Sequence, residues 1–109
     1  MRRSIIAIII GTVLFNMIIY IPGLTAGSEV EKGRRLYEEK RCGLCHAIGG
    51  KGGKMGPDIS YVGSKRDRDW IMRYFKDPKG TMEGAKMLSV KGTDEEISAL
   101  ADYMLSLKK

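Results

Sequence analysis

The chain has 109 residues, with 19 Lys or Arg side chains, 13 Asp or Glu side chains and a formal net charge of +6. This length provides for one domain, and the first 27 residues do not look like part of it. Two cysteines and one histidine cannot complete a structural zinc site from soft ligands alone, because such a site takes four ligands.

Residues 1–27 have the composition of an export signal. Arg2 and Arg3 precede a mostly apolar run at residues 5–21, which is the order found in signal peptides. Two outcomes stay open. Cleavage would release a soluble protein that begins near Ser28, whereas an uncleaved run, about 25 Å long as a helix, would anchor the chain in a membrane. Either outcome places the rest of the chain outside the cytoplasm, in the periplasm.

A first helix of the remaining domain is predicted from Glu29 to Lys40. Its apolar side chains Val30, Leu36 and Tyr37 fall near one face among many charged residues. That spacing is typical of a helix that packs one side on a core. No segment of the chain alternates convincingly with a period of two, so strands are not expected.

The segment CGLCH, at residues 42–46, holds both cysteines and the only histidine of the chain. On a helical turn, two thiols at this spacing reach the two vinyl groups on one porphyrin edge, and the imidazole that follows faces the iron. A zinc site would instead put the neighbours Cys45 and His46 on one tetrahedral metal, and a redox Cys-x-x-Cys would follow a strand. The segment therefore favours covalent haem attachment, with both thiols in thioethers and no disulfide.

Two more helices are predicted after this segment. One runs from about Asp67 to Lys76, where Asp77 and Pro78 end it. The other follows Thr93, which forms a capping box with Glu96. Their apolar stripes comprise Trp70, Ile71, Tyr74 and Phe75 in the first, and Ile97, Leu100, Ala101, Met104 and Leu105 in the second. The predicted fold is all-α, about three helices with long loops around a cofactor.

From about Ser28 to Lys109 the chain resembles the small bacterial monohaem cytochromes c of class I. The matching segments are CGLCH, GPDISYVGSKRDRDWIMRYFKDP, GAKML and TDEEISALADYMLSL, which stand in the order typical of that family. The resemblance divides the chain into a signal peptide or membrane anchor at 1–27 and a monohaem cytochrome c domain at 28–109. It implies one covalently bound haem c, buried among three helices with one edge exposed.

The resemblance also assigns roles to single residues. Cys42 and Cys45 would be the thioether attachment points, and His46 would be the proximal ligand of the iron. The backbone carbonyl of Pro57 would accept a hydrogen bond from the proximal imidazole, which would fix the ring and raise its basicity. Trp70 resembles a family aromatic residue near the haem propionates, with a plain core position as the alternative.

The same resemblance predicts how the first and last helices meet. Gly33 and Tyr37 match positions of the first helix that cross the last one, where Leu100 and Tyr103 would meet them. A glycine at such a crossing lets two backbones approach closely, although it weakens the helix that contains it.

The sixth iron ligand in this family is a methionine. His46 is the only histidine, so two histidines from one chain cannot ligate the iron. Met82 and Met87 both stand in the loop before the last helix. The family places its ligand sixteen residues before the tyrosine of the terminal helix, and Met87 stands sixteen residues before Tyr103. The resemblance thus implies His46 and Met87 as the iron ligands, with Met82 as the alternative.

The function that the resemblance implies is one-electron transfer by a carrier that is not an enzyme. His/Met ligation fills all six positions of the iron, so its coordination changes little between oxidation states. The alternatives are a fixed haem c subunit of a respiratory complex, and a haem sensor or small peroxidase with an open distal position. Basic residues around CGLCH and the Met87 loop predict a redox partner with an acidic docking surface. A nucleic-acid partner is not expected of an exported chain.

Overall fold

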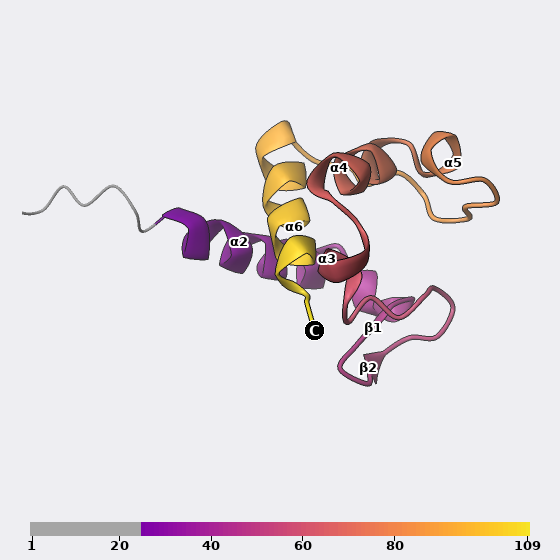
Figure 1. The fold of residues 1–109 in the computed structure, drawn as a ribbon, viewed down its shortest axis with the longest axis horizontal. Helices are drawn as coiled ribbons and strands as arrows, with labels where there is room; N and C mark the ends of the chain where they lie inside the picture. Colours follow the sequence, from indigo (N-terminus) through magenta and orange to yellow (C-terminus); the bar gives the residue numbers. More distant parts are fainter. Residues whose placement is uncertain (1–24) are drawn as a thin grey trace, which may run out of the picture.

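The computed structural model describes residues 25–109, so the predicted apolar run at residues 5–21 lies outside the described part. In chain order the elements are α2 (Thr25–Glu39), η2 (Cys42–Leu44), β1 (Ala47–Ile48), β2 (Lys51–Gly52), α3 (Val62–Lys65), α4 (Arg68–Lys76), α5 (Pro78–Thr81) and α6 (Asp94–Ser106). Figure 1 shows their arrangement, and the all-α prediction is confirmed apart from one antiparallel pair of two-residue strands. None of the helices in residues 25–109 is long and apolar enough to span a membrane.

The three long helices lie where the sequence predicts them, with small shifts at their ends. α2 begins at Thr25, four residues before the predicted start, because the segment TAGS has no apolar position that could reveal a helical period. α4 follows Asp67, whose side chain accepts a hydrogen bond from the Trp70 backbone (2.8 Å). The predicted capping box of α6 is confirmed, since Thr93 and Glu96 each accept a bond from the other's backbone N–H.

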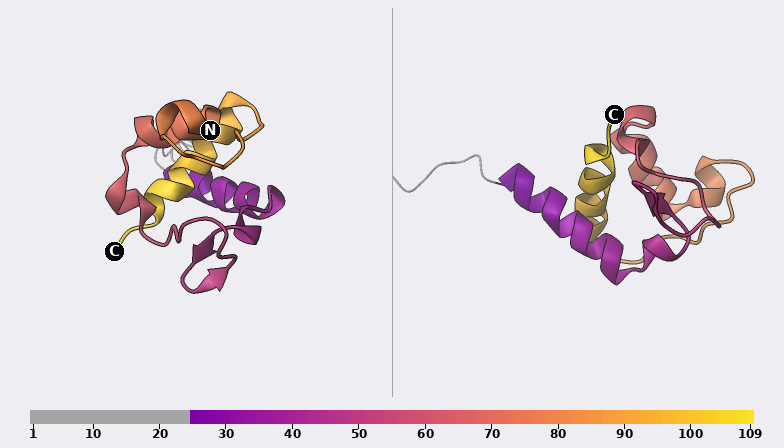
Figure 2. Two further views of the ribbon diagram at one scale, coloured as in Figure 1. Left: turned by 90° about the vertical axis from the view of Figure 1, so that its right-hand side faces the viewer. Right: turned by 90° about the horizontal axis from the view of Figure 1, so that it is seen from below.

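The frame of the domain is the crossing of α2 and α6, which Figure 1 and both views of Figure 2 show lying across each other. Gly33 makes this crossing close: a Cβ atom there would overlap the Ala99 carbonyl oxygen and lie 2.7 Å from Tyr103 Cβ. The rings of Tyr37 and Tyr103 meet edge to face, with centroids 5.7 Å apart. The predicted crossing is confirmed with one change: Ala99, and not Leu100, lies against Gly33, while Leu100 lines a cavity.

One hydrophobic core joins α2, α4 and α6. Its buried members are Leu36, Tyr37, Ile71, Phe75, Ile97, Ala99, Leu100, Ala101 and Met104. The short α3 joins this frame through Gly63, whose backbone N–H donates to the Leu107 carbonyl (2.9 Å). Three helices that meet in one core can hold the segments between them around a cofactor.

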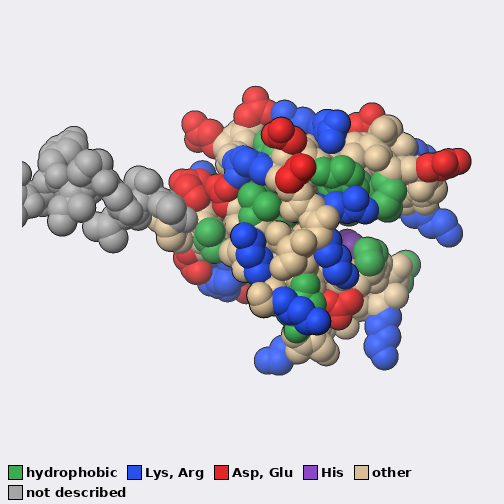
Figure 3. Space-filling model, viewed as in Figure 1, with side chains coloured by type: hydrophobic (Ala, Val, Ile, Leu, Met, Phe, Trp, Pro, Cys, Tyr) green, Lys and Arg blue, Asp and Glu red, His purple; other side chains and the backbone are tan. Residues whose placement is uncertain are grey.

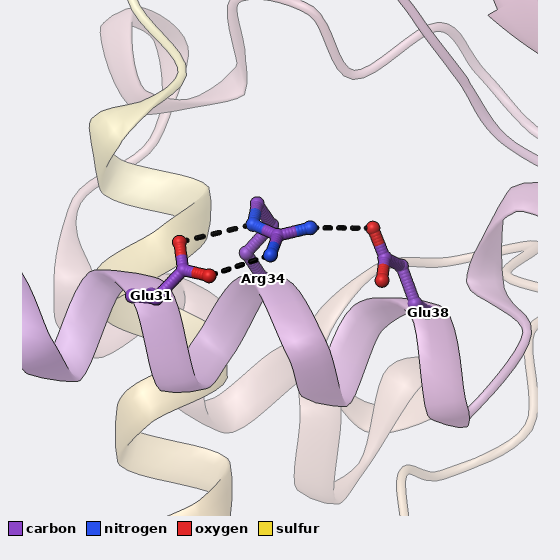
Figure 4. A network of polar contacts seen from close by, with 3 residues as sticks. All are labelled: Glu31, Arg34 and Glu38. Carbon is purple, nitrogen blue, oxygen red and sulfur yellow. Dashed lines mark hydrogen bonds and ion pairs between the residues drawn. The ribbon is translucent and has the colours of Figure 1, made fainter.

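The exposed side of α2 is stabilised within the helix itself. Arg34 donates hydrogen bonds to both carboxylate oxygens of Glu31 (2.5 and 3.0 Å) and to Glu38 (2.6 Å), as Figure 4 shows. The hydrogen bond from Arg34 lowers the pKa of Glu31. Water screens such surface pairs, so the packing on α6, and not this network, supplies most of the stability of α2.

Candidate functional site

A cavity of about 350 Å³ lies beside the core, between the segment that follows α2 and the segment that precedes α6. Most of its walls are apolar or aromatic, and they include Ile59, Ile71, Phe75, Leu100 and Met104. Figure 3 shows the molecule hollowed at the right, with hydrophobic side chains and Lys or Arg side chains along the hollow. An apolar enclosure of this kind suits a large apolar cofactor.

Four of the five residues that the sequence singled out line this cavity: Cys42, His46, Pro57 and Met87. The fifth, Cys45, is not part of the lining but lies on the same turn as Cys42. Residues far apart in the sequence thus meet around one space. The alternative methionine, Met82, lines it as well.

The turn that holds the two thiols is a short 3₁₀ helix. Arg41 takes a left-handed conformation (φ 57°), which ends α2 and directs the chain into η2. The carbonyl oxygen of Cys42 then accepts hydrogen bonds from the backbone N–H groups of Cys45 (3.2 Å) and His46 (3.0 Å). The two cysteines and the histidine are therefore held on one tight turn. Burial raises the pKa of the Cys42 thiol.

The imidazole of His46 is oriented by the Pro57 backbone. Its Nδ1 atom lies 2.8 Å from the Pro57 carbonyl oxygen, so a protonated Nδ1 donates a hydrogen bond there. A histidine that uses Nδ1 in this way has Nε2 available as a ligand atom. The partner carbonyl also raises the basicity of the ring, which strengthens it as a metal ligand.

A glycine-rich loop presses its backbone onto the attachment turn. Gly53 donates to the Gly43 carbonyl (2.9 Å), and a Cβ atom at Gly53 would overlap the carbonyl oxygen of Leu44. The sequence explains the glycines of this loop only as sharp turns, which is correct for Gly49 and Gly50, with φ of 59° and 79°. Close approach is a second reason that the sequence does not reveal, because the contacted atoms belong to the backbone.

The methionine side of the cavity is a loop between α5 and α6. Met82 directly follows α5 and its side chain is 39% exposed, while Met87 is half-buried and packs against the core cluster. Met55, the methionine nearest to His46 in the sequence, is 89% exposed and does not line the cavity. The candidates for a sulfur ligand are thus Met82 and Met87.

One wall of the cavity is basic and aromatic. Lys65 and Arg66 line it, and the Arg66 guanidinium lies 4.1 Å from the centre of the Trp70 ring. Trp70 in turn stacks on Tyr74, with ring centroids 4.9 Å apart. Cations at the edge of an apolar cavity suit the carboxylates of a bound group. The sequence missed both basic residues, because a run such as KRDR looks the same on any solvated surface.

The hydroxyl of Tyr37 is an unpaired buried polar atom on the same cavity. Among the residues that the structure describes, it is the one buried side-chain oxygen or nitrogen without a hydrogen-bond partner. Burial is the main cause that raises the pKa of Tyr37 to about 12. Its neighbours include Cys42, which contributes to the same shift.

These residues fit a covalently attached haem. Two thiols and an oriented imidazole supply the attachment points and one axial ligand, and a thioether supplies the second. The apolar walls match a porphyrin, and Lys65 and Arg66 match its carboxylates. Each part of the donor set thus has a counterpart in that group.

Comparison with known proteins supports the same assignment. The family model described as Cytochrome c matches residues 30–108. Cytochrome c oxidase subunit 2 of Alkalihalophilus pseudofirmus is 27% identical over 104 residues, which cover 82% of this chain and 30% of that protein. A nitric oxide reductase subunit of Halomonas halodenitrificans is 31% identical over 94 residues, covering 75% and 59%. The chain thus spans less than two thirds of either relative.

Proposed function

The chain belongs to the cytochrome c family, and we propose that it is a one-electron carrier with His46 and Met87 as the axial ligands of its haem iron. Membership of the family confirms the resemblance predicted from the sequence and implies a covalently bound haem c. When bound, the haem supplies the chemistry, because its iron takes up and releases one electron. The residues of the chain hold the group, set its ligands and limit its contact with water.

The observation that carries the proposal is the convergence of Cys42, His46 and Met87 on one apolar cavity. Cys42 and Cys45 are proposed as the two attachment points, on the turn that also orients His46. The Pro57 carbonyl, 2.8 Å from Nδ1 of His46, supports Nε2 as the ligating atom. A ligand that does not move with oxidation state favours fast electron transfer, because little has to rearrange.

Met87 is proposed over Met82 because of its surroundings. It is half-buried and packs against the core cluster, whereas Met82 is 39% exposed at the end of α5. A sulfur ligand held by packing loses less conformational freedom when it binds than an exposed one. A thioether ligand favours ferrous iron, and the apolar walls add to this by disfavouring the extra charge of ferric iron.

An acidic redox partner is proposed from the distribution of charge. The described part of the chain has 17 basic and 13 acidic residues. Lys51 and Lys54 follow the attachment segment, and Lys86 directly precedes Met87; all three are exposed. Such a surface steers an acidic partner toward the haem edge and speeds the encounter more than it tightens the complex.

The location of the domain is also a proposal. Residues 1–27 would be a cleaved signal peptide or a retained anchor, and residues 28–109 an extracytoplasmic cytochrome c domain. Both relatives are named as subunits, which favours a second candidate: a fixed haem c subunit of a respiratory complex. A native product that stays in membranes after a high-salt wash and begins at Met1 or Arg2 would indicate an anchor. A soluble product that begins near Ser28 would indicate cleavage.

An intact mass and an absorption spectrum of the exported protein test the central proposal. The mass should exceed that of the polypeptide by one haem after denaturation, and the oxidised protein should show the weak methionine-to-iron band at the red end of the visible spectrum. A mass equal to the bare chain would refute haem attachment. Rapid binding of carbon monoxide by the unaltered ferrous protein would refute the carrier and favour a sensor or small peroxidase.

A further inference from the structure

We propose that Gly56 is a positioning residue for His46, whose bare backbone acts as a stop for one face of the imidazole ring. This inference rests on the proposed role of His46 as an axial ligand. It concerns how the ring plane is fixed, which the hydrogen bond to Pro57 alone does not determine, because a single bond at Nδ1 leaves the ring free to tilt about that bond.

The contact is with the ring itself. A Cβ atom built at Gly56 would lie 2.7 Å from Cε1, 2.9 Å from Nδ1 and 3.2 Å from Nε2 of His46. The three distances span the side of the ring that holds both nitrogens. Distances below 3.0 Å do not occur between real Cβ atoms and their neighbours, so any side chain at this position would displace the imidazole or the backbone.

The backbone at Gly56 cannot easily retreat, because hydrogen bonds hold it on both sides. Its N–H donates to the Cys45 carbonyl (2.7 Å), and the N–H of Ile59 donates to the Ala47 carbonyl (3.0 Å). These two bonds join the loop to the residues directly before and after His46. The imidazole, on its flexible side chain, is therefore the part that would move.

Gly56 is needed for space and not for its conformation. Its φ lies outside the left-handed region, in contrast to Gly49 and Gly50, which have positive φ and open space around the Cβ position. An alanine at Gly56 would thus act through contact with the ring alone. That makes the substitution a clean probe of ring position.

The test compares Gly56→Ala with two other glycine-to-alanine changes in the haem-containing protein. Gly63→Ala is a matched control for lost stability, because its Cβ would overlap the carbonyl oxygen of Leu105, away from His46. Gly43→Ala is a mild control inside the attachment motif, since its Cβ would lie at an ordinary 3.8 Å from Tyr37.

Gly56→Ala should tilt the ring and weaken the bond from Nδ1 to the Pro57 carbonyl. The His46 ring N–H should then exchange with solvent about tenfold faster, and the reduction potential should rise, because a less basic imidazole stabilises ferric iron less. Gly63→Ala should lower the denaturation midpoint without moving either quantity. Equal values of exchange rate and potential in Gly56→Ala and the parent protein would overturn the proposal.

A measurement on the unaltered protein keeps the proposal testable if Gly56→Ala does not fold. In the diamagnetic ferrous protein, the α-protons of Gly56 should give nuclear Overhauser effects to the Cε1 proton of His46. Their absence would refute the contact. This outcome is distinct from failure of the proposed function, which would show in the parent protein as a spectrum without His/Met ligation.

Discussion

The histidine side of the cavity, residues 42–59, is held by backbone contacts, whereas the methionine side, residues 79–92, depends mainly on side-chain packing. On the histidine side, hydrogen bonds from Gly53, Gly56 and Ile59 join the glycine-rich loop to the attachment turn. On the methionine side, no backbone-to-backbone hydrogen bond holds residues 86–89 within the described part of the chain. The nearest ones join Ala85 to Met82 (3.2 Å) and Val90 to Phe75 (2.8 Å).

This difference indicates which axial bond yields first. Backbone hydrogen bonds fix the position of His46 before any metal bond forms, so that ligand is preorganised. Met87 is positioned by packing alone, and an iron–sulfur bond there has to supply part of the order of its own loop. We therefore expect perturbations to break the methionine bond well before the histidine bond.

The largest effect is expected from the attachment turn. Replacing both Cys42 and Cys45 by alanine should abolish covalent haem and leave a chain without a stable fold, because about 85 residues form a modest core and the cavity would stay unfilled. Intact mass and far-ultraviolet circular dichroism of the exported product measure both losses. A well-folded, haem-free double variant would show that the histidine side is stable without its cofactor.

Substitution of Met87 tests the weaker side directly. Met87→Ala should abolish the methionine-to-iron band and lower the reduction potential, because water or hydroxide in place of a thioether does not favour ferrous iron. It should also open a position for carbon monoxide. Met82→Ala is the matched control from the same loop and should keep the band. The opposite pattern would identify Met82 as the ligand.

A change at the helix crossing should affect both sides together. Gly33→Ala places a methyl group against the Ala99 carbonyl and should cost about 1–3 kcal/mol of stability through overpacking. Gly27→Ala, in the first turn of the same helix, meets nothing within 4 Å and should be neutral or stabilising by up to about 1 kcal/mol. Chemical denaturation followed at the haem band and in the far ultraviolet should give one shared midpoint for each variant. Separate midpoints would mean that the two sides do not share the α2–α6 frame.

The contrast between the two sides also explains what the sequence could predict. Cys42, Cys45 and His46 are neighbours in the chain, so their spacing alone predicts their chemistry and their shared turn. Met87 could be selected only by its distance from Tyr103, because the loop around it has no local pattern. The three long helices were predictable from apolar periodicity and from caps such as Thr93.

Features that depend on atoms from distant segments could not be predicted. The role of Gly56 depends on where the His46 ring lies, and that position is set by hydrogen bonds between two segments that the sequence does not connect. Lys65 and Arg66 form part of the cavity wall because α3 packs on α6, although their sequence pattern is that of an exposed charged run. Ala99 replaced Leu100 at the helix crossing, since a shift of one residue rotates a helix position by about 100°.

A smaller effect is expected from the cap that follows the methionine loop. Thr93→Ala removes the side-chain oxygen that accepts from the Glu96 backbone (3.1 Å) and should cost about 1 kcal/mol in a denaturation experiment. Glu96→Gln is the control, because glutamine can still bond back to the Thr93 N–H. If the methionine side depends on where α6 begins, Thr93→Ala should also weaken the methionine-to-iron band as temperature rises. An unchanged band up to the unfolding transition would show that the loop is independent of this cap.

The smallest effect is expected from Tyr37→Phe, on the wall next to Cys42. The buried hydroxyl has no hydrogen-bond partner, so its removal should be neutral or stabilising by about 1 kcal/mol near pH 7. The difference should depend on pH, because the pKa of Tyr37 is raised to about 12 in the folded state and is about 10 in an unfolded chain. Between these two values the unfolded chain releases a proton that the folded protein keeps.

The sign of this alkaline effect follows from the raised pKa. The stability linked to the protonated Tyr37 is fully present below about pH 10 and is lost as the pH rises toward 12. Tyr37→Phe should therefore lose less stability than the parent over that window, although Tyr103, whose pKa burial also raises, keeps part of the loss in both proteins. Denaturation midpoints at pH 7, 9 and 11 measure the difference. If Tyr37→Phe is instead destabilised at pH 7, the hydroxyl has a partner in the haem-containing protein, and the histidine side is held by one more polar contact than its backbone provides.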